Sequence, residues 1–272
     1  MKIKSLLTLI LAMTLNAAMS APSEANYYRF WRGAQRADLT SAQFEKALNE
    51  KLLPATGALF STTVGIKSYQ PVLLDRVLAQ SGKYPVETAL LTYRSEAEYK
   101  AYRATAEGQA YGDLHFEMFE KSTSGSLVPE LYQGTVKIEG AYDLVGKEVD
   151  WNGGMSRFKV YSRSGSFSDA QYLQSIQDHI EHMTQSGPSA AVILVARDYV
   201  LEYSLWNSRA SLAKANCTRV ETFDPHTGRV VTTLLDDLVE VTSRTDMEIE
   251  LKRGNWLHAG QGVRYLPVLP SL

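Results

Sequence analysis

One pattern of residues occurs twice in this chain at a constant separation, and it limits the folds that the chain can adopt. The segment Arg29–Leu52 (RFWRGAQRADLTSAQFEKALNEKL) is matched without a gap by Arg157–Ile180 (RFKVYSRSGSFSDAQYLQSIQDHI), an offset of 157 − 29 = 128 residues. Each copy has the features of a strand, a short loop and a capped helix. The interval therefore predicts a duplicated α+β unit. The matched pairs are Arg29 with Arg157, Phe30 with Phe158, Ala42 with Ala170, Gln43 with Gln171, and the helical apolar positions Phe44, Leu48 and Leu52 with Tyr172, Ile176 and Ile180.

Alternating and helical apolar patterns extend each copy to the order β-α-β-β-α-β, which is the ferredoxin-like pattern. In the first copy we predict strands at 27–32, 65–74, 86–93 and 126–132, and helices from Asp38 or Thr40 to about Pro54, from Ser95 to Thr105 and from 107 to 119. In the second copy a hairpin is predicted at 190–206, a helix from Asn207 or Ser208 to about Thr218, and a last strand at 230–242. The predicted division is a signal peptide at 1–20, a first unit at 21–135, a connector at 136–154, a second unit at 155–246 and a C-terminal tail at 247–272.

The first twenty residues have the pattern of a secretory signal peptide. Two lysines precede an apolar run at Leu6–Leu15, and small residues lead to a predicted cleavage before Ala21. No second long apolar run follows, so we expect no integral membrane segment in the mature chain. Cys217 is the only cysteine, which excludes an intramolecular disulfide. The chain is predicted to be periplasmic or secreted.

The charge of the mature chain argues against nucleic acid as a partner. Removing the two lysines of the signal leaves 28 − 2 = 26 basic residues against 30 acidic ones, a formal charge of 26 − 30 = −4. The sequence contains no Ser-His-Asp spacing, phosphate loop or dinucleotide fingerprint. A small-molecule ligand is therefore the expected partner, and a homo-oligomer is left open.

The ends of the third predicted strands can also be compared. Tyr93–Ala97 (YRSEA) and Trp206–Ala210 (WNSRA) each place an aromatic residue and a serine cap before a helix. The first copy continues as Tyr99-x-x-x-Arg103-Ala104-Thr105-x-x-Gly108-x-x-Tyr111-x-x-x-His115. These motifs resemble the dimeric α+β barrel superfamily, which includes the antibiotic-biosynthesis monooxygenase-like and stress-responsive barrel families. The resemblance implies that two ferredoxin-like units pair their sheets, here within one chain as a tandem duplication. Because members include cofactor-free monooxygenases, haem degraders, chlorite dismutases, isomerases and proteins with no known activity, the fold leaves the chemistry open.

Two histidine-containing helices offer candidates for chemistry. His115 follows Tyr111 by one helical turn on an apolar face, and we predict this pair as catalytic because a neutral imidazole can transfer protons near physiological pH. The alternative is a structural histidine bonded to the backbone. His179 and His182 have a spacing that a metal or haem could use, but no carboxylate or cysteine completes the set. No metal site and no cofactor are predicted.

Cations and aromatic residues alternate along the two first strands. If paired sheets brought these faces into one cavity, the cavity would suit an anionic ligand, because a guanidinium matches the geometry of a carboxylate. The alternative is that these side chains are exposed or are paired with Glu87 and Glu202. The predicted ligand-binding residues are Arg29, Trp31, Arg157, Lys159, Tyr161, Tyr93 and Trp206.

Three classes of function remain. The first is a periplasmic small-molecule enzyme of the cofactor-independent α+β barrel type, with monooxygenase- or isomerase-like proton transfer on an anionic substrate. The second is a non-catalytic periplasmic ligand-binding or envelope protein that uses the same cavity. The third is a haem-binding barrel protein, which the resemblance allows although the sequence shows no clear proximal ligand motif.

Overall fold

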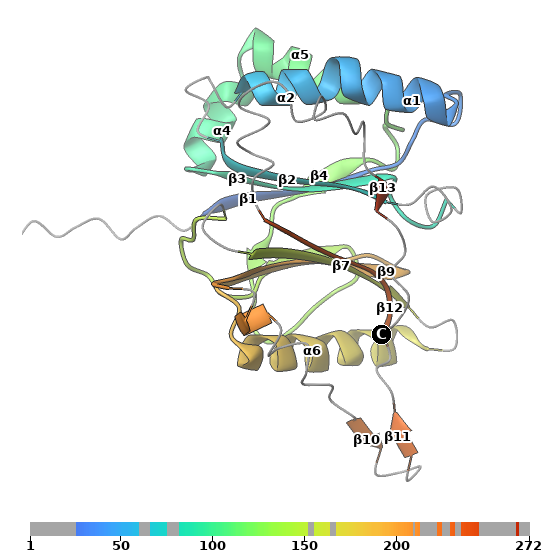
Figure 1. The fold of residues 1–272 in the computed structure, drawn as a ribbon, viewed down its shortest axis with the longest axis vertical. Coiled ribbons are helices and arrows are strands. Elements are labelled where there is room, and N and C mark those ends of the chain that lie inside the picture. The colour runs from blue at the N-terminus through green and yellow to red at the C-terminus, as the bar shows by residue number, and fades with distance from the viewer. Residues whose placement is uncertain are drawn as a thin grey trace, which may run out of the picture.

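The computed structural model describes residues 26–59, 66–74, 82–151, 155–163, 167–208, 210–212, 222–224, 229–231, 235–244 and 265–266. They form four layers, in which two β-sheets lie face to face and helices cover the outer face of each sheet (Figure 1). The prediction of an α+β fold is confirmed. Among the described helices none is long and apolar enough to cross a membrane. The predicted signal peptide and Cys217 lie outside the described residues.

The first sheet is built mainly from the N-terminal half of the chain. Strand β1 (Tyr27–Gly33) lies between β3 (Glu87–Tyr93) and β4 (Gly125–Leu127), and it is antiparallel to both. On the other side of β3 lies β2 (Ile66–Leu74), again antiparallel, and β13 (Tyr265–Leu266) adds a short parallel strand at the edge. The spatial order is β13-β2-β3-β1-β4.

A nearly continuous helical segment covers this sheet. It consists of α1 (Ser41–Ala47), a π-helical turn η1 (Leu48–Leu52) and α2 (Leu53–Leu59), and the predicted cap Thr40 begins it with a capping box. The prediction that the helix ends near Pro54 is wrong. The wider π-helical turn lies immediately before this proline, where a regular turn would place the ring against the carbonyl four residues earlier.

Two further helices complete the cover of the first sheet. Ser95 caps α4 (Glu96–Arg103), as predicted, and Thr105 caps α5 (Ala106–His115) by accepting a hydrogen bond from a backbone N–H in the first turn. Helix α5 ends at His115, four residues before the predicted end, and Phe119 instead forms an isolated bridge with Gln35. The α4–α5 corner brings Tyr102 close to the sheet face.

The second sheet is covered by one long helix, α6 (Asp169–Ser186), which Ser168 begins with a capping box and Gly187 ends in a left-handed conformation. The predicted hairpin at 190–206 is present as β8 and β9. Short strands β10 (Thr222–Asp224) and β11 (Arg229–Val231) form a separate two-stranded sheet. In spatial order the second sheet contains β12 (Leu235–Arg244), β7 (Met155–Arg163), β9 (Tyr199–Trp206), β8 (Ala190–Val195), β6 (Gly140–Asp143) and β5 (Glu130–Leu131).

The two sheets have a common topology. If the strands of each predicted unit are numbered along the chain, the order is fourth, first, third, second in both sheets, as β4-β1-β3-β2 and as β12-β7-β9-β8. The register agrees as well, because Tyr27 pairs with Tyr93 in one sheet and Met155 pairs with Trp206 in the other. The offset is 155 − 27 = 128 residues on the first strand and 206 − 93 = 113 on the third.

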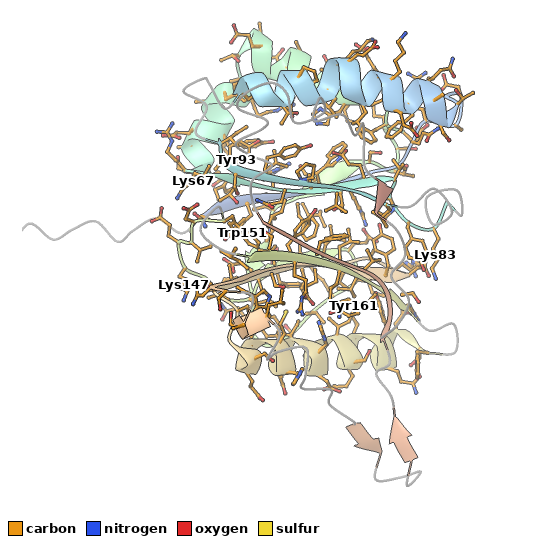
Figure 2. All side chains as sticks on the ribbon, viewed as in Figure 1. Lys67, Lys83, Tyr93, Lys147, Trp151 and Tyr161 are labelled. Atoms are coloured by element: carbon orange, nitrogen blue, oxygen red, sulfur yellow. The ribbon has the colours of Figure 1, made fainter. Side chains whose placement is uncertain are left out.

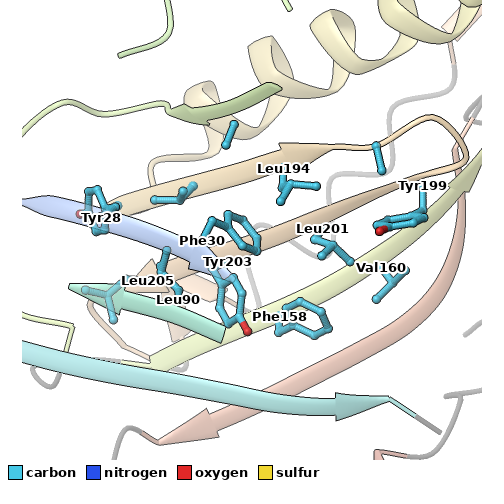
Figure 3. Packing of buried hydrophobic residues seen from close by; sticks show 14 of the residues in the cluster. Tyr28, Phe30, Leu90, Phe158, Val160, Leu194, Tyr199, Leu201, Tyr203 and Leu205 are labelled. Carbon is cyan, nitrogen blue, oxygen red and sulfur yellow. The ribbon is translucent and has the colours of Figure 1, made fainter. Parts of the chain in front are cut away.

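The apolar faces of the two sheets form a shared core. Figure 3 shows Tyr203 of β9 between Phe30 of β1 and Phe158 of β7, with ring centroids 5.3 and 4.8 Å apart. The Tyr203 hydroxyl lies 2.9 Å from the backbone carbonyl of Gln70 and 3.2 Å from that of Thr88, both in the first sheet, and its one proton is shared between these two acceptors. These bonds satisfy a buried hydroxyl and tie the two sheets together.

The region between the two predicted units differs from the expectation. The single strand predicted at 126–132 is two strands, because β4 pairs with β1 whereas β5 pairs with β6 of the second sheet. Pro129 lies between them and lacks the N–H that a continuous strand would need. The predicted connector at 136–154 contains β6 and the buried Trp151, which packs in the core between the sheets (Figure 2).

The C-terminal predictions fall largely outside the described residues. The last strand begins five residues later than predicted and pairs with β7 along its length. Of the helix predicted from Asn207 or Ser208, only the first turn near Leu212 is described, and of the tail at 247–272 only β13.

Candidate functional site

A cavity of about 200 Å³ lies between the first sheet and its own helices. Its floor consists of side chains that point from β1, β2 and β3 toward the helices, and α4 and α5 supply the opposite wall. Tyr93, which lines it, lies in the layer between this sheet and the helices (Figure 2). Aromatic side chains are the largest group in the lining, which also contains one carboxyl group, one imidazole and two guanidinium groups.

The carboxyl group of the cavity belongs to Glu87, the first residue of β3. It is 1% exposed, and each of its oxygens accepts one hydrogen bond, from the Trp31 indole N–H at 3.0 Å and from the Tyr69 hydroxyl at 3.1 Å. Among the described residues no cation forms an ion pair with it. Burial raises the pKa of Glu87 from 4.5 to about 7, and the two neutral donors only partly oppose this shift. Glu87 can therefore take up and release a proton near neutral pH.

His115 lies at the end of α5 with its ring against Trp31 and Tyr111, at centroid distances of 4.9 and 4.8 Å. Its Nδ1 is 2.8 Å from the carbonyl oxygen of Tyr111. Because a carbonyl can only accept, Nδ1 carries the proton and Nε2 is the acceptor of the neutral ring. Burial lowers the pKa of His115 to about 4, so the ring is neutral at physiological pH. The predicted alternative of a backbone-bonded histidine describes this geometry, and the ring still offers an acceptor at the cavity.

Tyr111, predicted as the partner of His115, lines the same cavity, but its hydroxyl is engaged elsewhere. The hydroxyl oxygens of Tyr111 and Thr56 are 2.7 Å apart, and Thr56 donates its only proton to the carbonyl of Leu52 at 3.0 Å. Tyr111 must then donate to Thr56. Burial raises the pKa of Tyr111, so this proton is held firmly and the residue positions α5 against α2.

Two guanidinium groups give the cavity a positive character. Arg29 donates from Nε to the Ser126 hydroxyl at 3.0 Å, and its guanidinium carbon lies 4.9 Å from the centre of the Tyr99 ring. Arg103 donates to the carbonyl of Gly108. Neither arginine forms an ion pair with a carboxylate of the described residues. Both can therefore attract an anionic group that enters the cavity.

The predicted ligand-binding residues divide between two places. Arg29, Trp31 and Tyr93 line the cavity of the first sheet together with the predicted catalytic pair. The residues predicted from the second copy lie on the α6 side of the second sheet, and the expectation of one common cavity is wrong. The two sheets face each other with their apolar alternate residues, so the polar alternates point to opposite outer faces. The residues on the second face are Arg157, Lys159, Tyr161 and Trp206.

On this second face the polar side chains satisfy one another around Glu202, which is fully buried. Its carboxylate accepts hydrogen bonds from Arg157 at 3.1 Å, from Tyr161 at 2.8 Å and from Ser204 at 3.2 Å, and His179 Nε2 lies 2.8 Å away. Burial by itself would raise the pKa of Glu202, but the charge of Arg157 and the bond to His179 hold it well below its usual value. The alternative reading of Arg157 as the ion-pair partner of Glu202 is thus confirmed. Figure 2 places Tyr161 on this side, toward α6.

No metal centre is found in the part of the chain that the structure describes. His179 bonds to a carboxylate that is already paired, and no group of three or more metal-ligating side chains occurs among the described residues.

Sequence reasoning missed several residues of the cavity as functional groups. Glu87 entered only as a pairing partner, and Tyr69, Tyr102 and Arg103 were not nominated. A usable signal for Glu87 was an acidic residue inside the segment 86–93, which the sequence predicts as a strand, and the structure buries all seven residues of that strand. Such a residue is rarely buried without a compensating partner, so its neighbourhood is a candidate site.

Several solved structures resemble the chain weakly. A proposed monooxygenase from Fusobacterium nucleatum aligns over 72% of this chain and 82% of its own, with 9% identity and a TM-score of 0.38. A proposed monooxygenase from Lactobacillus acidophilus aligns over 81% and 96%, with 10% identity and a TM-score of 0.37. An anthrone oxidase-like protein aligns over 81% and 95%, with 11% identity and a TM-score of 0.37. No family model matches the sequence, and no curated protein matches it. At this level of similarity the structures assign the chain neither a family nor an activity.

Proposed function

We propose that this chain is a small-molecule enzyme of the cofactor-independent α+β barrel type, and that it transfers protons on an anionic substrate in the cavity of the first sheet. The observation that carries the proposal is Glu87, a buried carboxyl group with a pKa near 7 that lines the cavity and is bound only by neutral donors. A general base is most effective when its pKa lies near the working pH.

In this proposal Glu87 removes a proton from an acidic C–H or O–H group of the substrate. The Trp31 and Tyr69 donors fix the orientation of the carboxylate. Arg29 and Arg103 bind the substrate anion and stabilise the negative charge that develops as the proton leaves. In an isomerase-like reaction, Glu87 then returns the proton to a different atom of the resulting enolate or phenolate. In a cofactor-independent monooxygenase-like reaction, the enolate or phenolate instead transfers electrons to dioxygen, which is the co-substrate.

His115 has a supporting part in this scheme. Its Nε2 can accept a hydrogen bond from the substrate, but with a pKa of about 4 the imidazole is a much weaker base than Glu87 at neutral pH. We therefore assign the principal proton transfer to Glu87.

The same proposal includes two statements about the whole chain. The common strand order and register of the two sheets support an internal duplication of ferredoxin-like units that pair as in a dimeric α+β barrel. The N-terminal pattern of lysines, apolar residues and small residues supports a periplasmic or secreted location.

The proposal can be tested without knowing the natural substrate. Phenylpyruvate carries a single ring, a carboxylate and an acidic CH₂ group, and its exchange with solvent deuterium can be followed by NMR. We expect the protein to accelerate this exchange at pH 7 and Glu87→Gln to reduce the acceleration about a hundredfold or more. Glu107→Gln, on the exposed side of α5, is the matched control and should exchange like the parent.

The other outcomes are distinct. Stabilisation by phenylpyruvate in a thermal shift, with no catalysed exchange of this or related keto acids, favours the non-catalytic ligand-binding protein. Equal exchange by the parent and Glu87→Gln overturns the assignment of the base. A preference for the neutral ketone phenylacetone overturns the anionic substrate class.

A further inference from the structure

Tyr102, near the end of α4, has a hydroxyl group that lacks a partner in the described protein. The residue lines the cavity and is 9% exposed, and its hydroxyl oxygen is buried without a hydrogen bond. Two other tyrosines of the cavity have paired hydroxyls, since Tyr69 bonds to Glu87 and Tyr111 bonds to Thr56. Buried hydroxyls in native proteins are nearly always paired, so an exception at a cavity points to a ligand that supplies the partner.

The next residue, Arg103, is held in place by the close approach of α4 and α5. Its guanidinium donates to the Gly108 carbonyl and packs on Gly112, where an added Cβ would lie 2.4 Å from both terminal nitrogens. Gly108 itself permits the approach, because a Cβ there would lie 2.1 Å from the carbonyl oxygen of Tyr102. The two glycines thus allow α4 and α5 to hold a cation close enough to the Tyr102 hydroxyl to act on it electrostatically, before any ligand binds.

The size and walls of the cavity limit what can bind there. An engineered apolar cavity of about 150 Å³ accommodates benzene. A cavity of about 200 Å³ lined by Trp31, Tyr93 and Tyr99 therefore has room for one aromatic ring with a small substituent. Aromatic walls favour a planar ring by stacking and edge contacts.

We propose that Tyr102 and Arg103 form the recognition site for the carboxylate of a single-ring aromatic acid, with the Tyr102 hydroxyl donating to one carboxylate oxygen and Arg103 supplying the charge. The inference rests on the proposed function of the cavity and specifies its ligand class. Burial raises the pKa of Tyr102, which keeps its hydroxyl protonated and able to donate.

The test uses benzoate as the probe and the full mature chain. Tyr102→Phe removes a hydroxyl that has no partner, so the melting temperature of the free protein should stay the same or rise. The dissociation constant for benzoate, measured by calorimetry, should increase about tenfold or more, as expected for a lost hydrogen bond to a charged group. Affinity for neutral benzamide should change much less.

Two further variants make the result specific. Tyr172→Phe removes a buried hydroxyl that donates to the Ala196 carbonyl, and it should lower the melting temperature without changing benzoate affinity. Gly112→Ala places a methyl group where the Arg103 guanidinium packs, and it should weaken benzoate binding.

Each contrary result has a separate meaning. If Tyr102→Phe binds benzoate as tightly as the parent, or destabilises the free protein as much as Tyr172→Phe does, the recognition site is overturned. If the parent binds no benzoate yet catalyses Glu87-dependent exchange of phenylpyruvate, the recognition site is also overturned and the proposed function stands. If the parent neither binds benzoate nor catalyses the exchange of phenylpyruvate, the proposed function is overturned as well.

Discussion

Each sheet places a buried glutamate on its third strand, facing its own helices, but the two glutamates are in opposite chemical states. In the common register the position of Glu87 is taken by Val200 in the second sheet, and the position of Glu202 is taken by Ala89 in the first. The two acids therefore lie two residues apart in the common register, which places both on the same face of the strand. Burial raises the pKa of Glu87, whereas the charge of Arg157 overcomes burial at Glu202 and lowers its pKa.

The difference follows from what surrounds each carboxyl group. Glu202 lies beneath α6 in a closely packed layer and bonds to cationic and polar neighbours. It therefore stays ionised and does not bind a proton near neutral pH. Glu87 lies beside a cavity, and the small Ala89 occupies the place where the second sheet has its glutamate. One topology thus holds an ionised, paired acid in one half and an acid that titrates near neutral pH in the other.

The largest effect should come from removing the cation of the second sheet. Arg157→Ala leaves Glu202 charged and fully buried, and the loss of one partner of a buried ion pair costs about 3–5 kcal/mol. Arg29→Ala, the equivalent position on β1, removes bonds to Ser126 and should cost about 1 kcal/mol or less. Denaturant unfolding of both variants measures the difference. Equal losses of stability would contradict the distinction between a structural and a ligand-binding arginine.

The second effect concerns the pH dependence of stability. The pKa of Glu87 is about 7 in the folded state against 4.5 when unfolded, so the folded state binds the proton more tightly. The stability that this proton provides is complete below pH 4.5 and is lost as the pH rises through 7, a decrease of about 3 kcal/mol. Glu87→Gln should lack this decrease in unfolding curves recorded from pH 5 to 8.

Glu202 contributes in the opposite direction. Its lowered pKa gives stability that is present above its unfolded value and lost as the pH falls. Glu202→Gln should therefore leave the decrease between pH 5 and 8 in place. If Glu87→Gln retained the same slope as the parent, the carboxyl group at the cavity would not be the titrating group.

Much of the fold could be predicted because the pattern of apolar residues is local. The offset of 128 residues, the strand at 86–93 and the serine caps follow from spacing and capping chemistry. The π-helical turn before Pro54 and the division of 126–132 between two sheets depend on tertiary packing, which local propensity does not contain.

The site was predicted only in part. The alternation of side chains along a strand assigns each residue to one face of the sheet, but it does not say which element packs against that face. The pattern assigns Arg29, Trp31 and Arg157 to one cavity. In the structure Arg29 and Trp31 line the cavity between the first sheet and its own helices, whereas Arg157 lies on the outer face of the second sheet. The face of Arg157 meets α6 and Glu202 because the apolar alternates, such as Phe158, fill the space between the sheets. In the strand register Glu202 lies opposite Lys159 and also pairs with Arg157, whereas Glu87 lies opposite Gly33.

The smallest effect should come from replacing His115. As the pH changes, the titration of His115 changes the stability of the fold in the opposite direction to that of Glu87, which lines the same cavity. The pKa of His115 falls from 6.5 to about 4 on folding, so the stability due to the neutral ring is present above pH 6.5 and lost as the pH falls to 4. The contribution of Glu87 to the stability of the fold increases as the pH falls over nearly the same range. The two groups share Trp31, which bonds to the carboxylate and packs on the imidazole. In the parent the two slopes partly cancel.

His115→Phe keeps an aromatic ring beside Trp31 but removes the imidazole titration. Its unfolding free energy should therefore rise more steeply than that of the parent as the pH is lowered from 7 to 5, because only the Glu87 contribution remains. The two pKa shifts are similar in size, but the His115 shift should contribute less to the measured stability, because its ring is partly exposed and solvent screens it, whereas Glu87 is almost fully buried. Adding Glu87→Gln to His115→Phe should flatten the curve again. A His115→Phe curve parallel to that of the parent would show that this histidine is not kept neutral by the cavity, and the opposition between the two groups would then be wrong.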